Sequence, residues 1–151
     1  MYLDTNIFAK GAAFKGVDLA NENSIYNIVA TCEGRLKSDI YIEVVNSGKQ
    51  AKIYLGRAGD FWNEPTTELL LIPDNSEIID INVVSVDGKE KKNIPILLDF
   101  LPKRPIKTRR VYFKSSFLNN KIMNLEIADA GFGDMYFATD AKRNIEVSIW
   151  D

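Results

Sequence analysis

The chain has 151 residues, a formal net charge of −2 and 46% hydrophobic residues, including 8 Phe, 6 Tyr and 2 Trp. This length suits one domain, or one domain and a fragment of another, and the apolar content predicts a folded chain with a real core. With no histidine and the single cysteine Cys32, the sequence excludes a Ser-His-Asp or Cys-His catalytic site, an intrachain disulfide and, in effect, a structural zinc site.

The first predicted element is a short helix over residues 5–17 (TNIFAKGAAFKGV), with a small-residue face at Gly11–Ala13. A single helix without a partner helix cannot bury its own apolar face. We therefore expect residues 1–20 to be the end of an upstream domain plus a linker, and residues 21–151 to be a β-domain. An ordinary amphipathic lid on the β-domain is the open alternative.

The rest of the chain predicts β-strands, because apolar residues alternate with polar ones and turn residues separate the runs. The predicted strands are Asp39–Val45, Gln50–Leu55, Glu68–Ile72, Ile78–Val86, Lys92–Leu98, Arg109–Phe117, Ile122–Ala128 and Asn144–Trp150, with Ser24–Thr31 as a further candidate. Asn46–Gly48 and Asp87–Gly88 predict hairpin turns. We predict an all-β fold, an antiparallel β-sandwich of about eight strands with one short N-terminal helix.

Ala58–Glu64 (AGDFWNE) is the first candidate binding segment, with Phe61, Trp62 and Glu64 in a loop. An aromatic pair beside an acid can stack on a sugar or clamp a peptide. The plainer interpretation is that Trp62 fixes the loop to the edge of the core, and we expect Trp62 to be partly buried and structural.

Leu101–Arg110 (LPKRPIKTRR) is the second candidate, with five cations in which Arg104 and Arg109 are the candidate ligand-binding residues. They could meet phosphate or an acidic surface. The plainer interpretation is a solvated connector between strands, stiffened by its prolines. Asp129–Asp134 (DAGFGD) predicts a tight turn at its two glycines and supplies too few oxygen ligands for calcium.

Phe8–Gly16 (FAKGAAFKG) resembles the helix that ends the actin-like ATPase domain of DnaK-type chaperones, where a linker and a peptide-binding β-sandwich follow. The remaining chain resembles the C-terminal region of an uncharacterised bacterial family of DnaK-like proteins, in Ala58–Glu64, Leu101–Arg110 and Asp129–Asp134. This resemblance implies that residues 1–20 are the C-terminal helix of an upstream ATPase-like domain plus a linker. It also implies ATP in that upstream domain, no cofactor in this chain, and an extended peptide or protein, with the upstream ATPase domain, as partners.

The leading hypothesis is thus a non-catalytic peptide- or protein-binding domain of a DnaK-like, chaperone-type protein, which binds by strand addition. The alternative is a carbohydrate- or surface-binding β-sandwich module with Phe61 and Trp62 as its platform. An enzyme that uses carboxylates alone is the third class, but no acid pair can be nominated from spacing. No catalytic or metal residue is assigned. The weak charge and the lack of a signal peptide or membrane span favour a cytoplasmic protein without nucleic-acid or membrane partners.

Overall fold

The computed structural model describes residues 32–73, 77–105 and 107–150. In these residues all regular structure is β-strand, and no helix is present. The helix expected over residues 5–17 and the candidate strand Ser24–Thr31 lie outside the described residues. The predicted linker and the predicted domain boundary between residues 20 and 21 also lie outside the described residues.

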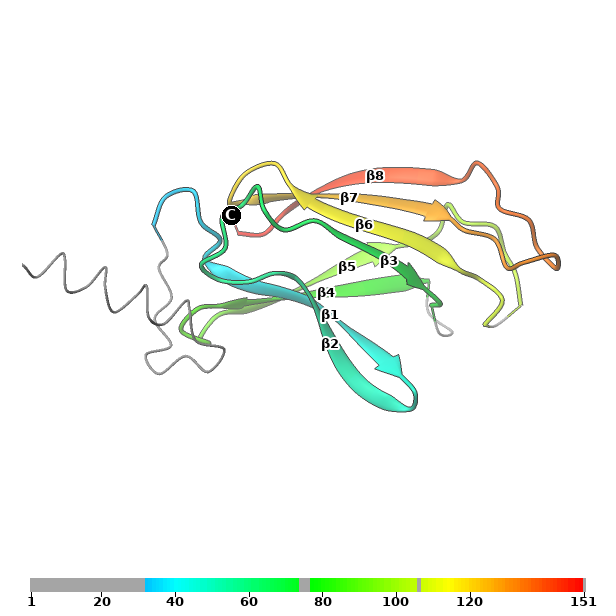
Figure 1. Ribbon diagram of the computed structural model, residues 1–151, viewed down its shortest axis with the longest axis horizontal. Coiled ribbons are helices and arrows are strands. Elements are labelled where there is room, and N and C mark those ends of the chain that lie inside the picture. Colours follow the sequence, from blue (N-terminus) through cyan, green and yellow to red (C-terminus); the bar gives the residue numbers. More distant parts are fainter. Residues whose placement is uncertain (1–31, 74–76, 106, 151) are drawn as a thin grey trace, which may run out of the picture. The chain divides into compact units, whose positions relative to one another are not determined.

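Eight antiparallel strands form two four-stranded sheets, as the sequence predicts for this part of the chain (Figure 1). The first sheet has the order β2-β1-β4-β5 and the second the order β3-β6-β7-β8. The strands are β1 (Ser38–Asn46), β2 (Lys49–Gly56), β3 (Thr67–Leu71), β4 (Ile78–Ser85), β5 (Lys91–Leu97), β6 (Val111–Phe117), β7 (Ile122–Asp129) and β8 (Lys142–Ser148). Each of the eight strands predicted after residue 38 is present, with its bounds shifted by a few residues at most.

The two sheets form two layers that share one hydrophobic core (Figure 1). Alternation explains this arrangement, because successive side chains of a strand point to opposite faces. In β6, Val111, Phe113 and Ser115 are buried, whereas the residues between them are half-buried. In the first sheet, Ile40 and Ile42 of β1 face the same core. The core therefore contains alternate residues of strands from both sheets.

The loops fall at two opposite ends of the sheets. Because all pairings are antiparallel, β1 and β5 run in one direction in the first sheet, and β3 and β7 run in one direction in the second. Figure 1 shows β1, β3 and β7 pointing to the same side. We call the end where the odd-numbered strands finish the distal end, on the right in Figure 1, and the other the proximal end.

The β1–β2 turn shows how local sequence sets the register. Asn46 pairs with Lys49, so only Ser47 and Gly48 lie in the loop, with φ angles of 51° and 78°. Two positive φ angles define the type I′ turn, whose twist matches that of a hairpin. The predicted hairpin at Asn46–Gly48 is therefore confirmed.

No helix suited to crossing a membrane is found in the described part of the chain.

Candidate functional site

The first sheet forks at its distal end. The β1–β4 ladder runs from Ser38 opposite Ser85 to Ile42 opposite Ile81 and stops there. The β1–β2 ladder continues to Asn46. The last four residues of β1, 43–46, therefore keep β2 on one side and have no ladder with β4 on the other.

Like charges give a physical reason for this fork. Continuing the β1–β4 register by one residue would place Glu43 directly opposite Asp80, on the same face of the sheet. Two carboxylates in that position repel each other, which destabilises a cross-strand pair. Both residues are exposed, and the Asp80 carboxylate forms no hydrogen bond or ion pair with any described residue. The ladder thus ends one residue before the repulsive pair.

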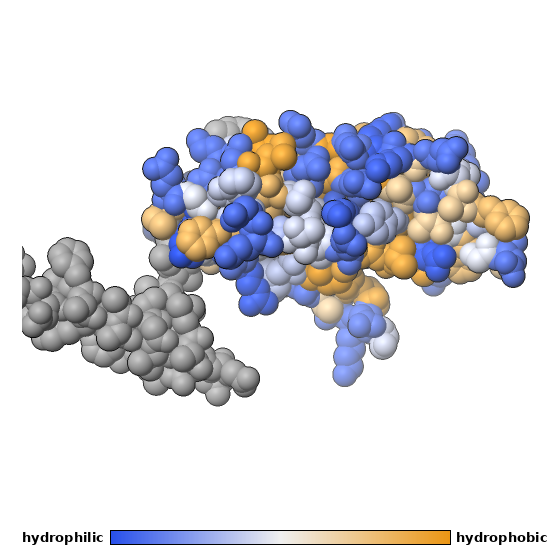
Figure 2. Space-filling view, turned by 45° about the horizontal axis from the view of Figure 1, so that its top comes forward, coloured by the Kyte–Doolittle hydropathy of each residue, from blue (hydrophilic) through white to orange (hydrophobic). Residues whose placement is uncertain are grey.

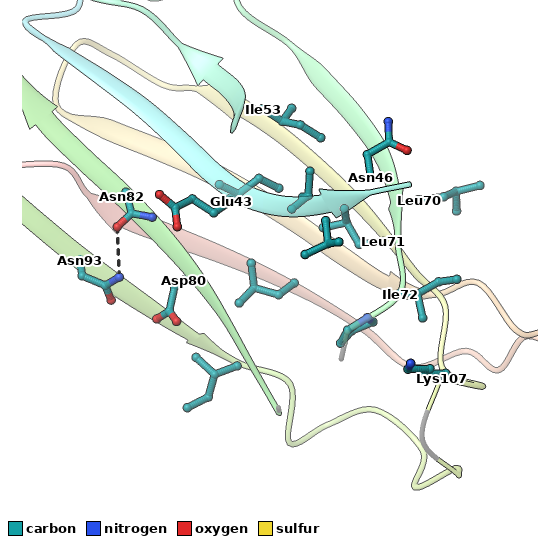
Figure 3. A pocket seen from close by; sticks show the side chains of 16 residues that line it. Glu43, Asn46, Ile53, Leu70, Leu71, Ile72, Asp80, Asn82, Asn93 and Lys107 are labelled. Carbon is teal, nitrogen blue, oxygen red and sulfur yellow. Dashed lines mark hydrogen bonds between the residues drawn. The ribbon is translucent and has the colours of Figure 1, made fainter. Parts of the chain in front are cut away.

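An open cleft of about 900 Å³ lies between this fork and the end of β3 (Figure 3). Its volume falls in the range of ligand-binding pockets. The lining is mainly aliphatic and comes from β1, β2, β3, β4 and the residues that follow β3: Ile42, Val44, Val45, Ile53, Leu70, Leu71, Ile72, Pro73, Ile78 and Ile79. The cleft can therefore accept apolar side chains.

The polar groups of the cleft are carboxylates and amides, with a single cation, Lys107. Asn93 donates to the side-chain oxygen of Asn82 over 3.4 Å, which joins β5 to β4 (Figure 3). Within the described residues, no group of three or more His, Cys, Asp or Glu residues is placed to hold a metal ion. The cleft can therefore offer a ligand apolar contacts from its aliphatic residues and hydrogen bonds from its carboxylate and amide groups.

The edge strand β3 borders the cleft and has few charged side chains that would oppose pairing with another chain. Leu70 is 61% exposed and Ile72 is 53% exposed, and the one charged residue of β3, Glu68, pairs with Lys114 at 2.7 Å. In the other sheet, the edge strand β2 instead presents exposed Lys49 and Lys52, and β5 forms the opposite edge. Charged side chains on an edge oppose pairing with another chain, whereas apolar ones invite it.

The loop with Phe61, Trp62 and Glu64 lies at the proximal end, between β2 and β3. Phe61 is 42% exposed, but the guanidinium of Arg35 lies 3.8 Å from the centre of its ring and covers one face. Trp62 is half-buried, packs against the core, and its backbone N–H donates to Gly34 O. Glu64 is exposed. The expected partial burial of Trp62 is confirmed.

Arg104 and Arg109 lie at the distal end, in the β5–β6 connection. Arg104 forms a bidentate pair with Asp129, both contacts being 2.7 Å, and the two side chains are only 5% and 0% exposed. A solvated connector is therefore the wrong interpretation for Arg104, because its guanidinium is buried by its partner. Arg109 is half-buried. The five candidate residues thus lie at opposite ends of the domain and form no common site.

Asp129 organises the β7–β8 loop around itself. Its carboxylate accepts hydrogen bonds from Arg104, from the backbone N–H of Gly131, and from both the N–H and the hydroxyl of Thr139. Burial raises the pKa of Asp129, but these hydrogen bonds outweigh burial and hold its pKa well below the usual value. The carboxylate is a structural anion that joins the two ends of the loop to the β5–β6 connection.

The cleft is not among the sites that the sequence predicts. The continuous apolar run Leu69–Ile72 was a usable signal, since a strand with both faces apolar must expose one of them unless both are covered. Consecutive Val44 and Val45 at the end of an alternating strand gave the same signal. The two apolar segments, Leu69–Ile72 and Val44–Val45, come together at the cleft only because strands that are far apart in the sequence pair with each other.

Trp62→Ala should lower the free energy of unfolding by about 2–3 kcal/mol, because a half-buried indole leaves less of a cavity than a fully buried one. Urea denaturation of both proteins, followed by circular dichroism, measures the difference. Phe61→Ala is the control, with an expected loss below about 1 kcal/mol for an exposed ring. Equal losses for the two variants would contradict a structural role of Trp62.

The described residues define an all-β domain with an apolar cleft at one end. Residues 35–149, which include all eight strands, match the family described as Domain of unknown function (DUF8552), and the chain belongs to this family. No curated protein matches the chain.

Proposed function

We propose that this domain, as a β-sandwich, binds an extended apolar segment of another protein in the distal cleft and catalyses no reaction. The observation that carries the proposal is the fork. Among the described residues, one side of β1 over residues 43–46 has no strand neighbour, and it lies beside an open cleft lined mainly by aliphatic residues. A free strand side and pockets for side chains are the two requirements for peptide recognition by strand addition.

The two parts of the site would act on different parts of the ligand. The free side of β1 would pair with the ligand backbone, which gives affinity independent of sequence. Val44, Leu71 and Ile79 line the cleft and would contact every second side chain of the ligand, because strand side chains alternate. Binding should therefore favour apolar residues and tolerate many sequences.

The resemblance to DnaK-like proteins extends this proposal to the longer protein. In that case an upstream domain binds ATP and changes the affinity of the cleft for its ligand, and the protein acts as a cytoplasmic chaperone. The order of segments in the sequence supports this, since residues 5–17, whose sequence predicts a helix with a small-residue face, precede the β-domain. The cleft is a better binding site than a Phe61 and Trp62 platform, because Arg35 covers one face of Phe61.

Val44→Asp in the full chain should weaken binding of a fluorescent seven-residue leucine-rich peptide at least about tenfold, which corresponds to about 1.4 kcal/mol. A carboxylate on the cleft wall would be desolvated by the ligand without a partner. Val86→Asp is the control for the added charge, because Val86 is 50% exposed and lies at the proximal end, away from the cleft. Its affinity, measured by fluorescence anisotropy, should stay within about twofold of the parent.

A second variant tests the fork without altering the apolar lining. Asp80→Lys would replace the carboxylate opposite Glu43 by an ammonium group. The two side chains would then attract each other, which favours extension of the β1–β4 ladder. The peptide should then bind less tightly, although every aliphatic residue of the cleft is retained. Unchanged affinity in both Val44→Asp and Asp80→Lys, or binding of soluble glycans without binding of peptides, would contradict the proposal.

A further inference from the structure

The β7–β8 loop, residues 130–141, exposes two large apolar side chains. Phe137 is 78% exposed and Met135 is 72% exposed, and no other large hydrophobic side chain among the described residues exceeds these fractions. Figure 2 shows hydrophobic colouring on the surface at this end of the molecule. Such exposure is unusual for an aromatic ring in a monomer and marks interaction sites when the side chains are close together.

The loop is built to hold these side chains in place. Phe132 donates from its backbone to Tyr136 O over 2.7 Å and closes the loop on itself. Arg104, already fixed by Asp129, donates to Phe137 O over 3.0 Å. The backbone of Phe137 is thus tied to a buried ion pair, so little backbone conformational entropy would be lost when a partner covers its ring.

The charges around the loop indicate what kind of partner fits. Asp134 and Asp140 are exposed on the loop, and neither carboxylate forms an ion pair or hydrogen bond with a described residue. The cations that follow are engaged, since Lys142 pairs with Glu126 and Arg143 with Asp99, each at 2.7 Å. Lys103, the exposed cation next to Arg104, belongs to the β5–β6 connection and not to the loop. The apolar pair is therefore flanked by free carboxylates.

We propose that loop 130–141 is a preformed docking element that inserts Phe137 and Met135 into an apolar pocket with a basic rim on a partner protein. Central, rigid aromatic side chains carry most of the affinity in protein interfaces, and complementary charges at the rim increase the association rate. Free carboxylates argue against an anionic lipid surface as the partner. This site is separate from the cleft of the proposed function.

The test begins with the full chain in its native host, with photoreactive benzoylphenylalanine at position 137. A protein captured there is identified by mass spectrometry and purified, and its affinity is measured by calorimetry. The double variant Met135→Ser, Phe137→Ser should bind at least about tenfold more weakly, and so should Asp134→Lys, Asp140→Lys. The affinity of the parent should fall as salt rises.

Two controls make the result specific. Leu118→Ser, at the proximal end, changes a side chain that is 47% exposed and should leave the affinity for the captured protein unchanged. Val44→Asp should also leave it unchanged, which separates this site from the peptide cleft. Capture of no protein at position 137, binding that survives the double serine variant, or binding of the parent to phosphatidylglycerol vesicles in place of a protein would overturn the proposal.

Discussion

Asp129→Asn should lower the free energy of unfolding by about 3–5 kcal/mol, the usual cost of removing one partner of a buried ion pair. The change keeps the size of the side chain but leaves the guanidinium of Arg104, which is 5% exposed, without a counter-charge. Both carboxylate oxygens of Asp129 accept hydrogen bonds from at least two donors. The amide nitrogen of asparagine would therefore face donors in either orientation.

Asp99→Asn is the matched control for this variant. Asp99 and Arg143 form an ion pair at 2.7 Å, the same distance as in the buried pair, but the arginine and aspartate side chains are 41% and 60% exposed. An exposed pair contributes about 0–1 kcal/mol, because water and salt screen it. Urea denaturation of the three proteins at neutral pH measures both differences, and equal losses would show that burial is unimportant here.

The effect of Asp129→Asn should shrink at acid pH. The pKa of Asp129 is lower in the folded state than the ordinary value of about 3.9, so its ionised form stabilises the fold at pH values above that value. This contribution is lost as the pH falls below about 4, toward the folded pKa. Denaturation at several pH values should therefore show the two proteins converging in acid and differing fully near neutrality.

The strands were predictable because each depends on local pattern. The alternating apolar residues of β4 and β7 and the turn residues at Asn46–Gly48 each act over a few positions. The same local chemistry predicts positive φ at Gly131 and Gly133, and both glycines have it. The assignment of strands to sheets depends on pairing over long sequence distances, and no local pattern contains it.

The candidate site was not predictable for the same reason. Arg104 and Asp129 belong to two segments that the sequence distinguishes, yet they are 25 residues apart and meet only because the β5–β6 connection passes beside the β7–β8 loop. The cleft likewise requires β1 and β4 to be neighbours while β3 lies in the other sheet. Composition and turn motifs instead directed attention to Phe61 and Trp62, at the end opposite the cleft.

The distal end combines the features that suit binding. It carries Val45, Leu70, Ile72, Ile78, Leu97, Met135 and Phe137, which are most of the exposed large hydrophobic residues among those described. A fold that exposed these residues only by chance would scatter them over both ends. Their concentration beside the fork and on the tethered β7–β8 loop supports two binding surfaces at one end of the domain.

Gly131→Ala should lower the free energy of unfolding by about 2–4 kcal/mol. Gly131 has a φ of 64°, where an L-residue costs about 1–2 kcal/mol, and overpacking typically adds about 1–3 kcal/mol. A Cβ at this position would lie 2.5 Å from Ala138 N and 2.7 Å from Tyr136 O. These are backbone atoms of the same closed loop, so no side chain can turn aside to relieve the clash.

Gly133→Ala separates the clash from the backbone strain. Gly133 has a similar φ of 59°, but a Cβ there would have no neighbouring atom within 4 Å. Its substitution should therefore cost only the strain, about 1–2 kcal/mol. The difference between the two variants in urea denaturation measures how tightly residues 131–138 are packed. A compact loop predicts that Gly131→Ala is clearly the more damaging change, whereas equal losses would mean that the loop opens to accept the methyl group and does not hold Phe137 in a fixed position.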